Sequence, residues 1–100
     1  MNTNFYEFEW DDDKAISNFR KHRVNFKDIM QIFYDPMLMT RYDDEHSDFE
    51  ERWLSLGKHR DGRVIVAIHT FTEITETTAL IRLISAITAS KRERQQYEQG

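Results

Sequence analysis

Side chains suited to phosphate chemistry gather near the end of this 100-residue chain. Arg82 lies inside a long apolar run, and Glu93, Arg94 and Tyr97 follow on a polar segment that should be helical. On a helix, Tyr97 would neighbour both Glu93 and Arg94. Guanidinium groups bind phosphate oxygens, and a carboxylate can take or give a proton. This part of the sequence therefore has the residue types needed to bind and cleave a phosphodiester.

Each of these residues also has a purely structural explanation. An arginine in an apolar strand needs a partner, which for Arg82 is either a substrate phosphate or a carboxylate such as Glu51. The KRER run at 91–94 is typical of a solvated helix face with internal ion pairs. Arg52, which begins a strand-like segment, is a further candidate for binding phosphate. The residue pattern alone leaves both explanations open.

Two histidines are candidates for proton transfer, because imidazole can gain or lose a proton near neutral pH. His22 ends the first helical segment, where it could instead be a cap favoured by the helix dipole. His69 lies in an apolar strand and could equally be a hydrogen-bonded core residue. The residues themselves do not choose between these roles.

An acidic segment, DDEHSDFEE at 43–51, carries six carboxylates and no Lys or Arg. Around His46 it could supply metal ligands, but its spacing matches no calcium or zinc motif. We expect a solvated loop. A further hypothesis is that its charge docks a basic segment of a partner protein, or holds basic side chains until a phosphodiester substrate competes for them.

The composition excludes several protein classes. The chain has no cysteine, which excludes thiolate zinc sites and thiol enzymes. A net charge of −4 argues against a general nucleic-acid-binding protein, although residues 82–100 carry four cations against two carboxylates. No apolar run approaches the roughly 20 residues that span a bilayer, and residues 1–4 do not begin a secretory leader. We expect a soluble, unexported protein.

Hydrophobic periodicity divides the chain into eight elements. The first helix has an apolar stripe of Ala15, Ile16 and Phe19, and Asp61-Gly62 predicts a hairpin. Strand alternation places Arg82 on one face with Ile84 and Ala86, and residues 72–77 are expected to be a polar connection. In order, the expected elements are a strand at 5–10, helices at 14–22 and from Asn25 to before Asp35-Pro36, strands at 37–42, 52–60, 63–71 and 78–87, and a helix at 88–97.

This order, β-α-α-β-β-β-β-α, predicts an α+β fold. The antiparallel sheet would have one face covered by helices, two of them N-terminal and one C-terminal. The chain is long enough for one core, so residues 1–100 should form a single domain.

Several segments resemble, in order and spacing, the BrnT family of type II toxins, relatives in fold of the RelE ribonuclease toxins. They span nearly the whole chain: FEWDDDKAISNFRKH, VNF, IFYDP, HSDFEERWLSLG, DGRVIVAIHT, IRLISA and KRERQQYE. The resemblance implies a RelE-like fold and a cytoplasmic, metal-independent ribonuclease that inhibits translation and growth. It also implies neutralisation by a BrnA-like antitoxin, with two toxins around an antitoxin dimer that alone contacts DNA. No cofactor and no membrane partner are implied.

The resemblance also favours functional roles for the residues discussed above. His22, which belongs to its KH pattern, or Glu93 would transfer protons. Four side chains would bind the scissile phosphate: Arg52, Arg82, Arg94 and Tyr97.

The sequence departs from the family pattern at two positions. Where such sequences commonly read ISAR, this chain has Ile87 in place of the arginine, and Arg23 stands where glycine is usual, at the end of a helix. The first departure supports an alternative, a toxin-like binding module with weakened catalysis that serves as antitoxin partner and corepressor. A third possibility is an α+β interaction domain without any role in nucleic-acid binding.

Overall fold

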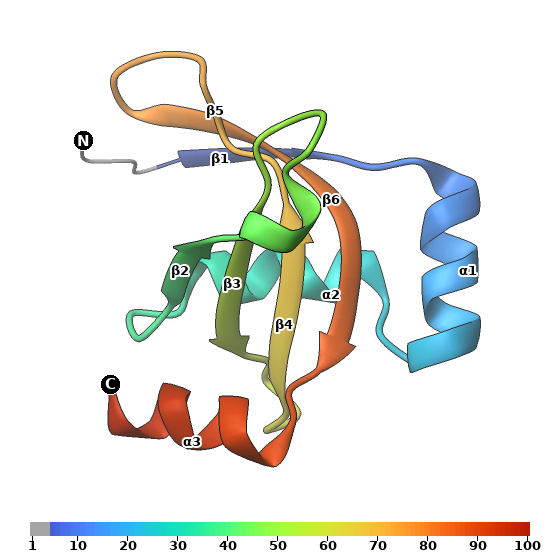
Figure 1. Cartoon of the computed structure of the whole chain (residues 1–100), viewed down its shortest axis with the longest axis vertical. Helices are drawn as coiled ribbons and strands as arrows, with labels where there is room; N and C mark the ends of the chain where they lie inside the picture. Colours follow the sequence, from blue (N-terminus) through green and yellow to red (C-terminus); the bar gives the residue numbers. More distant parts are fainter. Residues whose placement is uncertain (1–4) are drawn as a thin grey trace.

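The structure is a computed structural model that describes residues 5–100, so the expectation about a leader at residues 1–4 lies outside it. Six strands form one sheet in the order β1-β6-β4-β3-β2, with β5 also beside β6 (Figure 1). The strands are β1 (Phe5–Glu9), β2 (Met39–Tyr42), β3 (Trp53–Lys58), β4 (Val64–His69), β5 (Thr72–Glu73) and β6 (Thr78–Thr88). The helices are α1 (Asp12–His22), α2 (Phe26–Ile29) and α3 (Lys91–Gln99), with 3₁₀ segments η1 (Met30–Tyr34) and η2 (Asp44–His46).

The α+β class is confirmed, with one correction to the expected antiparallel sheet. Strand β1 runs parallel to β6, whereas all the other strand pairs are antiparallel. The alternation of Tyr6 and Phe8 identified β1 as a strand, but either direction of pairing would bury the same face. The segment expected to be a connection at 72–77 also contains the short strand β5.

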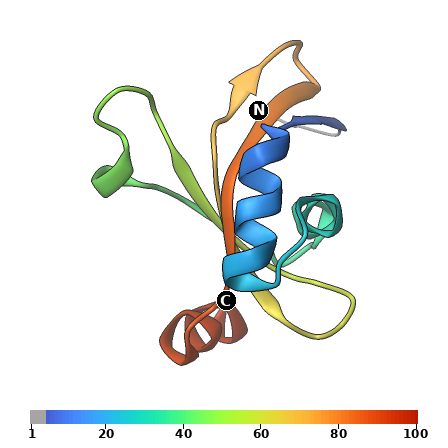
Figure 2. The same cartoon turned by 90° about the vertical axis from the view of Figure 1, so that its right-hand side faces the viewer.

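The sheet has helices on both faces, which corrects the expectation that one face carries them all. Helix α2 and η1 supply Phe26, Ile29 and Ile32 to the main core, opposite Ile65 and Ile81 of the sheet. Helix α3 lies on the other face, where Tyr97 packs on a smaller cluster with Leu56, Val64 and Val66. Figure 2 shows α2 on one side of the sheet, and α3 and the η2 loop on the other.

Helix α1 covers the edge of β6 with a face that its apolar residues predicted only in part: Ala15 packs on the main core as expected. Ile16 and Phe19 are 52% and 44% exposed, whereas Asn18 is buried. The Asn18 amide donates to the carbonyls of Ala86 and Val24, and its oxygen accepts from the Ala86 N–H. Because β1 pairs only with residues 78–82, the rest of this edge of β6 has no strand neighbour, and Asn18 satisfies the backbone groups of Ala86 there.

A β-bulge in β6 changes which residues share a face. The register shifts between Ile68 and His69, which pair with Ser85 and Leu83, so Ile84 is the extra residue. Ala86 consequently joins Ile81 and Leu83 in the main core, and it does not share the face of Arg82 as strict alternation had predicted.

The expected hairpin and the end of the second helix are confirmed. Helix α3 begins at Lys91 and not at residue 88 as expected, because β6 continues to Thr88 and Ser90 caps the helix. Asn25 caps α2, and the second helix ends before Pro36, although its second half is 3₁₀. Arg23 ends α1 with a positive φ of 57°, the conformation that glycine would adopt more easily. Within residues 5–100, no helix is long and apolar enough to cross a membrane.

Candidate active site

The sheet face that carries α3, here called the front face, changes from apolar to charged along its strands. Strand register aligns Met39, Leu56, Val66 and Ile87 in a row that packs toward α3. The next row contains Arg41, Leu54, Ile68 and Ser85. Beyond it lie Arg52, Thr70 and Arg82, where Asp43 hydrogen-bonds Arg52 and Thr70 hydrogen-bonds Arg82. Figure 1 shows the loop that contains η2 at this end of the strands. The charged end of the front face is therefore at the opposite end from α3.

Two of the predicted phosphate ligands meet at this charged end. Oε1 of Glu50 accepts hydrogen bonds from Nη2 of Arg82 at 2.5 Å and from Nη2 of Arg52 at 3.3 Å. We call these three residues the arginine cluster. The side chains of Arg82 and Glu50 are 40% and 38% exposed, so the cluster is open to solvent. The carboxylate partner of Arg82 is Glu50 and not its neighbour Glu51.

Backbone contacts fix both arginines. Arg82 donates its N–H to the Thr70 hydroxyl at 3.3 Å and accepts from the Thr70 N–H at 3.0 Å. Arg52 accepts from the Asp43 N–H at 2.9 Å, and its own N–H donates to Ser47 Oγ at 3.0 Å. The Arg52 Nε is buried without a hydrogen-bond partner. The backbone is thus fixed at both arginines, one within β6 and one directly before β3, and their guanidinium groups have further N–H donors.

The carboxyl of Glu50 is ionised at neutral pH. Desolvation raises the pKa of this carboxyl, but hydrogen bonding and charge from Arg82, and then from Arg52, outweigh it and lower the pKa below its ordinary value. The arginine cluster therefore carries one negative and two positive charges.

His46, on the same loop, is oriented by an aspartate. Its Nδ1 lies 2.7 Å from Oδ2 of Asp43, whose side chain is 5% exposed against 50% for His46. A carboxylate that fixes one ring nitrogen leaves the other free to exchange a proton with solvent or a ligand. This pairing of Asp43 and His46 makes His46 a candidate general base or acid.

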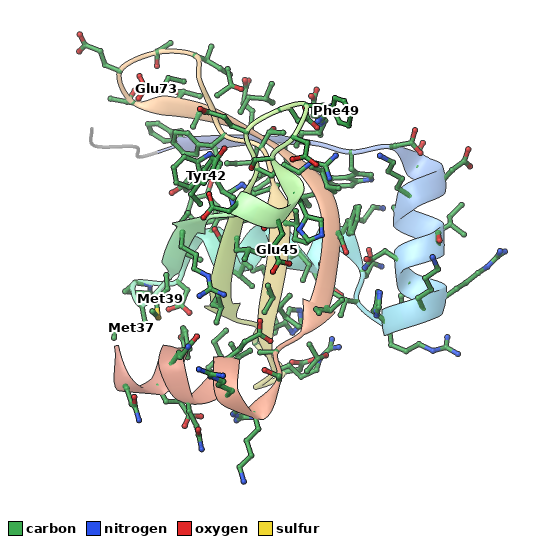
Figure 3. All side chains as sticks on the ribbon, viewed as in Figure 1. Met37, Met39, Tyr42, Glu45, Phe49 and Glu73 are labelled. Atoms are coloured by element: carbon green, nitrogen blue, oxygen red, sulfur yellow. The ribbon has the colours of Figure 1, made fainter. Side chains whose placement is uncertain are left out.

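A groove of about 490 Å³ separates the loop from α3. It is lined by residues of β2, β3, the loop and α3: Arg41, Tyr42, Asp43, Asp44, Glu45, His46, Leu54 and Glu93. Figure 3 shows Glu45 over the middle of the strands, between the η2 loop and α3. A second depression, of about 380 Å³, lies on the other side of the loop and is lined by Glu50, Thr70 and Arg82, among others. The loop thus borders two concave regions of the front face.

The three candidate residues of α3 have partners of their own. Glu93 accepts from the Ser90 N–H and forms a capping box, although it also lines the groove near His46. Arg94 pairs with Glu98 at 2.9 Å on the exposed surface. Tyr97 is 8% exposed and donates to Asp35. Burial, and then the hydrogen bond and charge of Asp35, raise the pKa of Tyr97 to about 12.

His22 lies away from the arginine cluster. It is exposed at the end of α1, where it lines a small depression between α1 and β6 with Lys14 and Lys21. The structure therefore brings together Arg52 and Arg82 and places Glu93 beside the same loop. It does not bring His22, Arg94 or Tyr97 to the arginine cluster.

His69 is a core residue. Its Nδ1–H donates to the Thr70 carbonyl at 2.8 Å, which leaves Nε2 to accept from Ser55 Oγ at 2.7 Å, and Thr40 donates to Ser55 in turn. His69 and Ser55 are 1% and 0% exposed. Burial lowers the pKa of His69 to about 4, against a smaller opposing effect of the Thr70 hydrogen bond. His69 is therefore neutral and structural.

Sequence reasoning missed two side chains of the charged end, Glu50 and His46 as a partner of Asp43. Both lie in the acidic segment, which was expected to be a solvated loop. The i,i+3 spacing of Asp43 and His46 was a usable signal, since a 3₁₀ turn brings such residues together. Within residues 5–100, no three or more His, Asp or Glu side chains are grouped so as to hold a metal ion.

The arrangement of strands and helices is that of a known class of toxin. A solved structure with a similar fold is the ribonuclease toxin BrnT from Brucella abortus, at a TM-score of 0.57. The match covers 88% of this chain and 100% of that chain at 21% sequence identity, so it establishes the fold. No protein of curated function matches the sequence.

The family follows from the sequence. Residues 10–93 match the family described as the ribonuclease toxin, BrnT, of type II toxin–antitoxin systems. The chain belongs to this family, which confirms the resemblance seen in its motifs.

Proposed function

We propose that this chain is an active ribonuclease that cleaves RNA without a metal ion, and that the charged end of the front face is its active site. The observation that carries the proposal is the convergence of Arg82, from β6, and Arg52, directly before β3, on one carboxylate oxygen. Two fixed guanidinium groups with unused donors form a binding site for an anion with several oxygens, such as a phosphodiester.

The reaction would be attack of a ribose 2′-oxygen on the adjacent phosphorus. A base takes the 2′ proton, the bond from phosphorus to the 5′-oxygen breaks, and an acid protonates that oxygen. Arg52 and Arg82 would stabilise the charge that develops on the phosphorus oxygens. His46, held by Asp43, is our first candidate for the proton carrier, and Glu93 of the same groove is the second. Both line the groove on the other side of the loop from the depression that contains Arg82, so the RNA would have to reach across the loop.

The other residues expected from the sequence remain predictions. His22, on the α1 side of β6, and Arg94, on the exposed face of α3, could contact RNA beyond the scissile phosphate. Tyr97 would act on the site by holding α3 in place. In the cell we expect a cytoplasmic toxin that a BrnA-like antitoxin neutralises, with two toxins on an antitoxin dimer that contacts DNA.

Purified protein and a labelled RNA test this function. We expect cleavage in the presence of EDTA, and a loss of about 100- to 1,000-fold in rate for Arg82→Ala with its melting temperature nearly unchanged. Arg20→Ala is the matched control, since it removes one exposed arginine from α1. Cleavage by Arg82→Ala at the wild-type rate would contradict the proposal, as would a rate that EDTA abolishes.

A second candidate function is supported by Ile87, an aliphatic residue at the position where the family pattern has arginine. In this alternative the chain binds its antitoxin and acts as a corepressor with little catalysis. Growth arrest and RNA loss on expression of the chain alone favour the ribonuclease. Normal growth at the same soluble level favours the binding module.

A further inference from the structure

The loop of residues 43–52 places a negative charge where the proposed function requires a phosphate. Oε1 of Glu50 is the single atom on which Arg82 and Arg52 both converge, at 2.5 Å and 3.3 Å. A substrate phosphate cannot take the same position while the carboxylate is there. The two anions must therefore compete.

The arginine cluster is a better match for a phosphate than for this carboxylate. Glu50 contacts each guanidinium through one Nη2, although each guanidinium has five N–H donors. The Arg52 Nε also has no partner, but it is buried, so the donors of Arg52 that an incoming anion can reach are those on its terminal nitrogens. A phosphodiester offers two non-bridging oxygens and could accept forked hydrogen bonds from both arginines.

The carboxylate is also placed so that it can leave. The loop is closed at its ends by a hydrogen bond from the Asp43 N–H to the Arg52 carbonyl and by Ser47, which contacts both residues. Glu50 makes none of these closing contacts and lies in the part of the loop between η2 and β3. The neighbouring Phe49 is fully exposed, and Figure 3 shows it at the outer end of the loop. Residues at such a tip can shift while the closed base of the loop stays in place.

We propose that Glu50 is a built-in competitor of RNA, a carboxylate that occupies the phosphate position of Arg52 and Arg82 in the free chain and is displaced by the substrate. The inference rests on the proposed function, because it names the regulation of that site. Glu50 lowers the affinity for RNA and keeps the two arginines paired when no substrate is bound. Removal of its charge strengthens RNA binding.

Glu51 provides a matched control. It is adjacent and exposed, and the described part of the chain offers it no ion pair. Glu50→Gln and Glu51→Gln change the net charge by the same amount at neighbouring positions. Any general electrostatic gain in RNA affinity is common to both variants.

The first experiment measures binding of a single-stranded 2′-O-methyl RNA oligonucleotide, which has no 2′-hydroxyl to react, by fluorescence anisotropy at one salt concentration. Glu50→Gln is expected to lower Kd about fivefold relative to Glu51→Gln, as for release of a partly exposed ion pair. Glu50→Asp, with a shorter reach, should fall between wild type and Glu50→Gln. Equal Kd values for the two Gln variants would overturn the proposal, and so would weaker binding by Glu50→Gln.

The second experiment separates this proposal from the proposed function. Inorganic phosphate is titrated into each protein while the Nε–H signals of Arg52 and Arg82 are followed by NMR. Glu50→Gln should respond at a several-fold lower phosphate concentration than wild type and Glu51→Gln. If Glu50→Gln shows this response but the wild-type chain does not cleave RNA, the competitor role of Glu50 is supported and the proposed ribonuclease function is rejected. An unchanged phosphate response in Glu50→Gln would reject the competitor, whether or not the chain cleaves RNA.

Discussion

The phenol of Tyr97 donates a 2.5 Å hydrogen bond to Oδ2 of Asp35, and so joins the last helix to the turn that follows η1. The same carboxylate accepts from the backbone N–H groups of Lys58 and Met37. Although desolvation raises the pKa of Asp35, the hydrogen bond from Tyr97 and those from the backbone lower it below its ordinary value. Asp35 is therefore an ionised anchor for α3, for β3 and for its own turn.

The first prediction concerns this anchor. Tyr97→Phe removes one hydrogen bond to a charged acceptor and should lower the free energy of unfolding by about 1–3 kcal/mol, measured by urea denaturation. Tyr42→Phe, at an exposed phenol, should change it by less than about 0.5 kcal/mol. If Tyr97→Phe instead loses RNA cleavage at unchanged stability, Tyr97 belongs to the catalytic machinery and not to the packing of α3.

The second prediction is a pH dependence set by His69. Its pKa in the folded chain is about 4, below the ordinary 6.5, because the ring is buried. The unfolded chain therefore binds a proton that the folded chain does not, and stability falls as pH is lowered from about 6.5 to 4. Once the pH is below both pKa values, His69 has lowered the free energy of unfolding by about 3 kcal/mol.

Comparison with a glutamine variant isolates the effect. His69→Gln should be less stable than wild type at pH 7, but it should lose less stability between pH 6.5 and 4. His22→Gln, at an exposed position, should leave the wild-type slope in place. An identical slope in wild type and His69→Gln would show that other groups cause the acid sensitivity.

The third prediction tests how α1 is attached to the sheet. Asn18→Ala leaves the N–H and C=O of Ala86 and the C=O of Val24 without their side-chain partner, so we expect a loss of about 2–4 kcal/mol. Asn18→Asp keeps the acceptor for the Ala86 N–H and should lose less if its charge is tolerated. Ser17→Ala, one residue away and exposed, is the control and should stay within about 0.5 kcal/mol. A small effect of Asn18→Ala would mean that water replaces the amide.

Asn18 also shows where prediction from the sequence stopped. Periodicity located every long element, because apolar spacing is a local property. It assigned the buried face of α1 to Ile16 and Phe19, which are exposed. The helix instead packs on a strand edge whose backbone N–H and C=O groups require hydrogen-bond partners. The direction of β1 and the bulge at Ile84 likewise depend on partners that are distant in sequence.

The candidate site was predictable in part for the same reason. Arg82 stood out as a charge within an apolar strand, for which a partner was expected, and Arg52 as a charge at the start of another strand-like segment. The partner, Glu50, lies in an acidic segment where six carboxylates are equivalent until the loop is folded. The hydrogen bond of Tyr97 was not predicted, because its acceptor, Asp35, is 62 positions away.

The last prediction concerns Ile87, the residue that stands in place of the family's arginine. Its side chain packs with the cluster beneath α3, in the same cross-strand row as Val66 and Leu56. An arginine here could lay its stem on that cluster and extend its guanidinium over the front face. Ile87→Arg should therefore increase the rate of RNA cleavage if the chain is a ribonuclease with one phosphate ligand missing, at a cost of about 1–2 kcal/mol in stability.

The comparison requires a variant with the same packing loss but no guanidinium. Ile87→Gln serves this purpose, because it gives up the aliphatic contact without adding charge. Faster cleavage by Ile87→Arg than by both wild type and Ile87→Gln, at matched folded fractions, would support a weakened ribonuclease. No gain in cleavage, together with unchanged binding to the antitoxin, would instead favour the binding module, since the front face would then lack more than one arginine for catalysis.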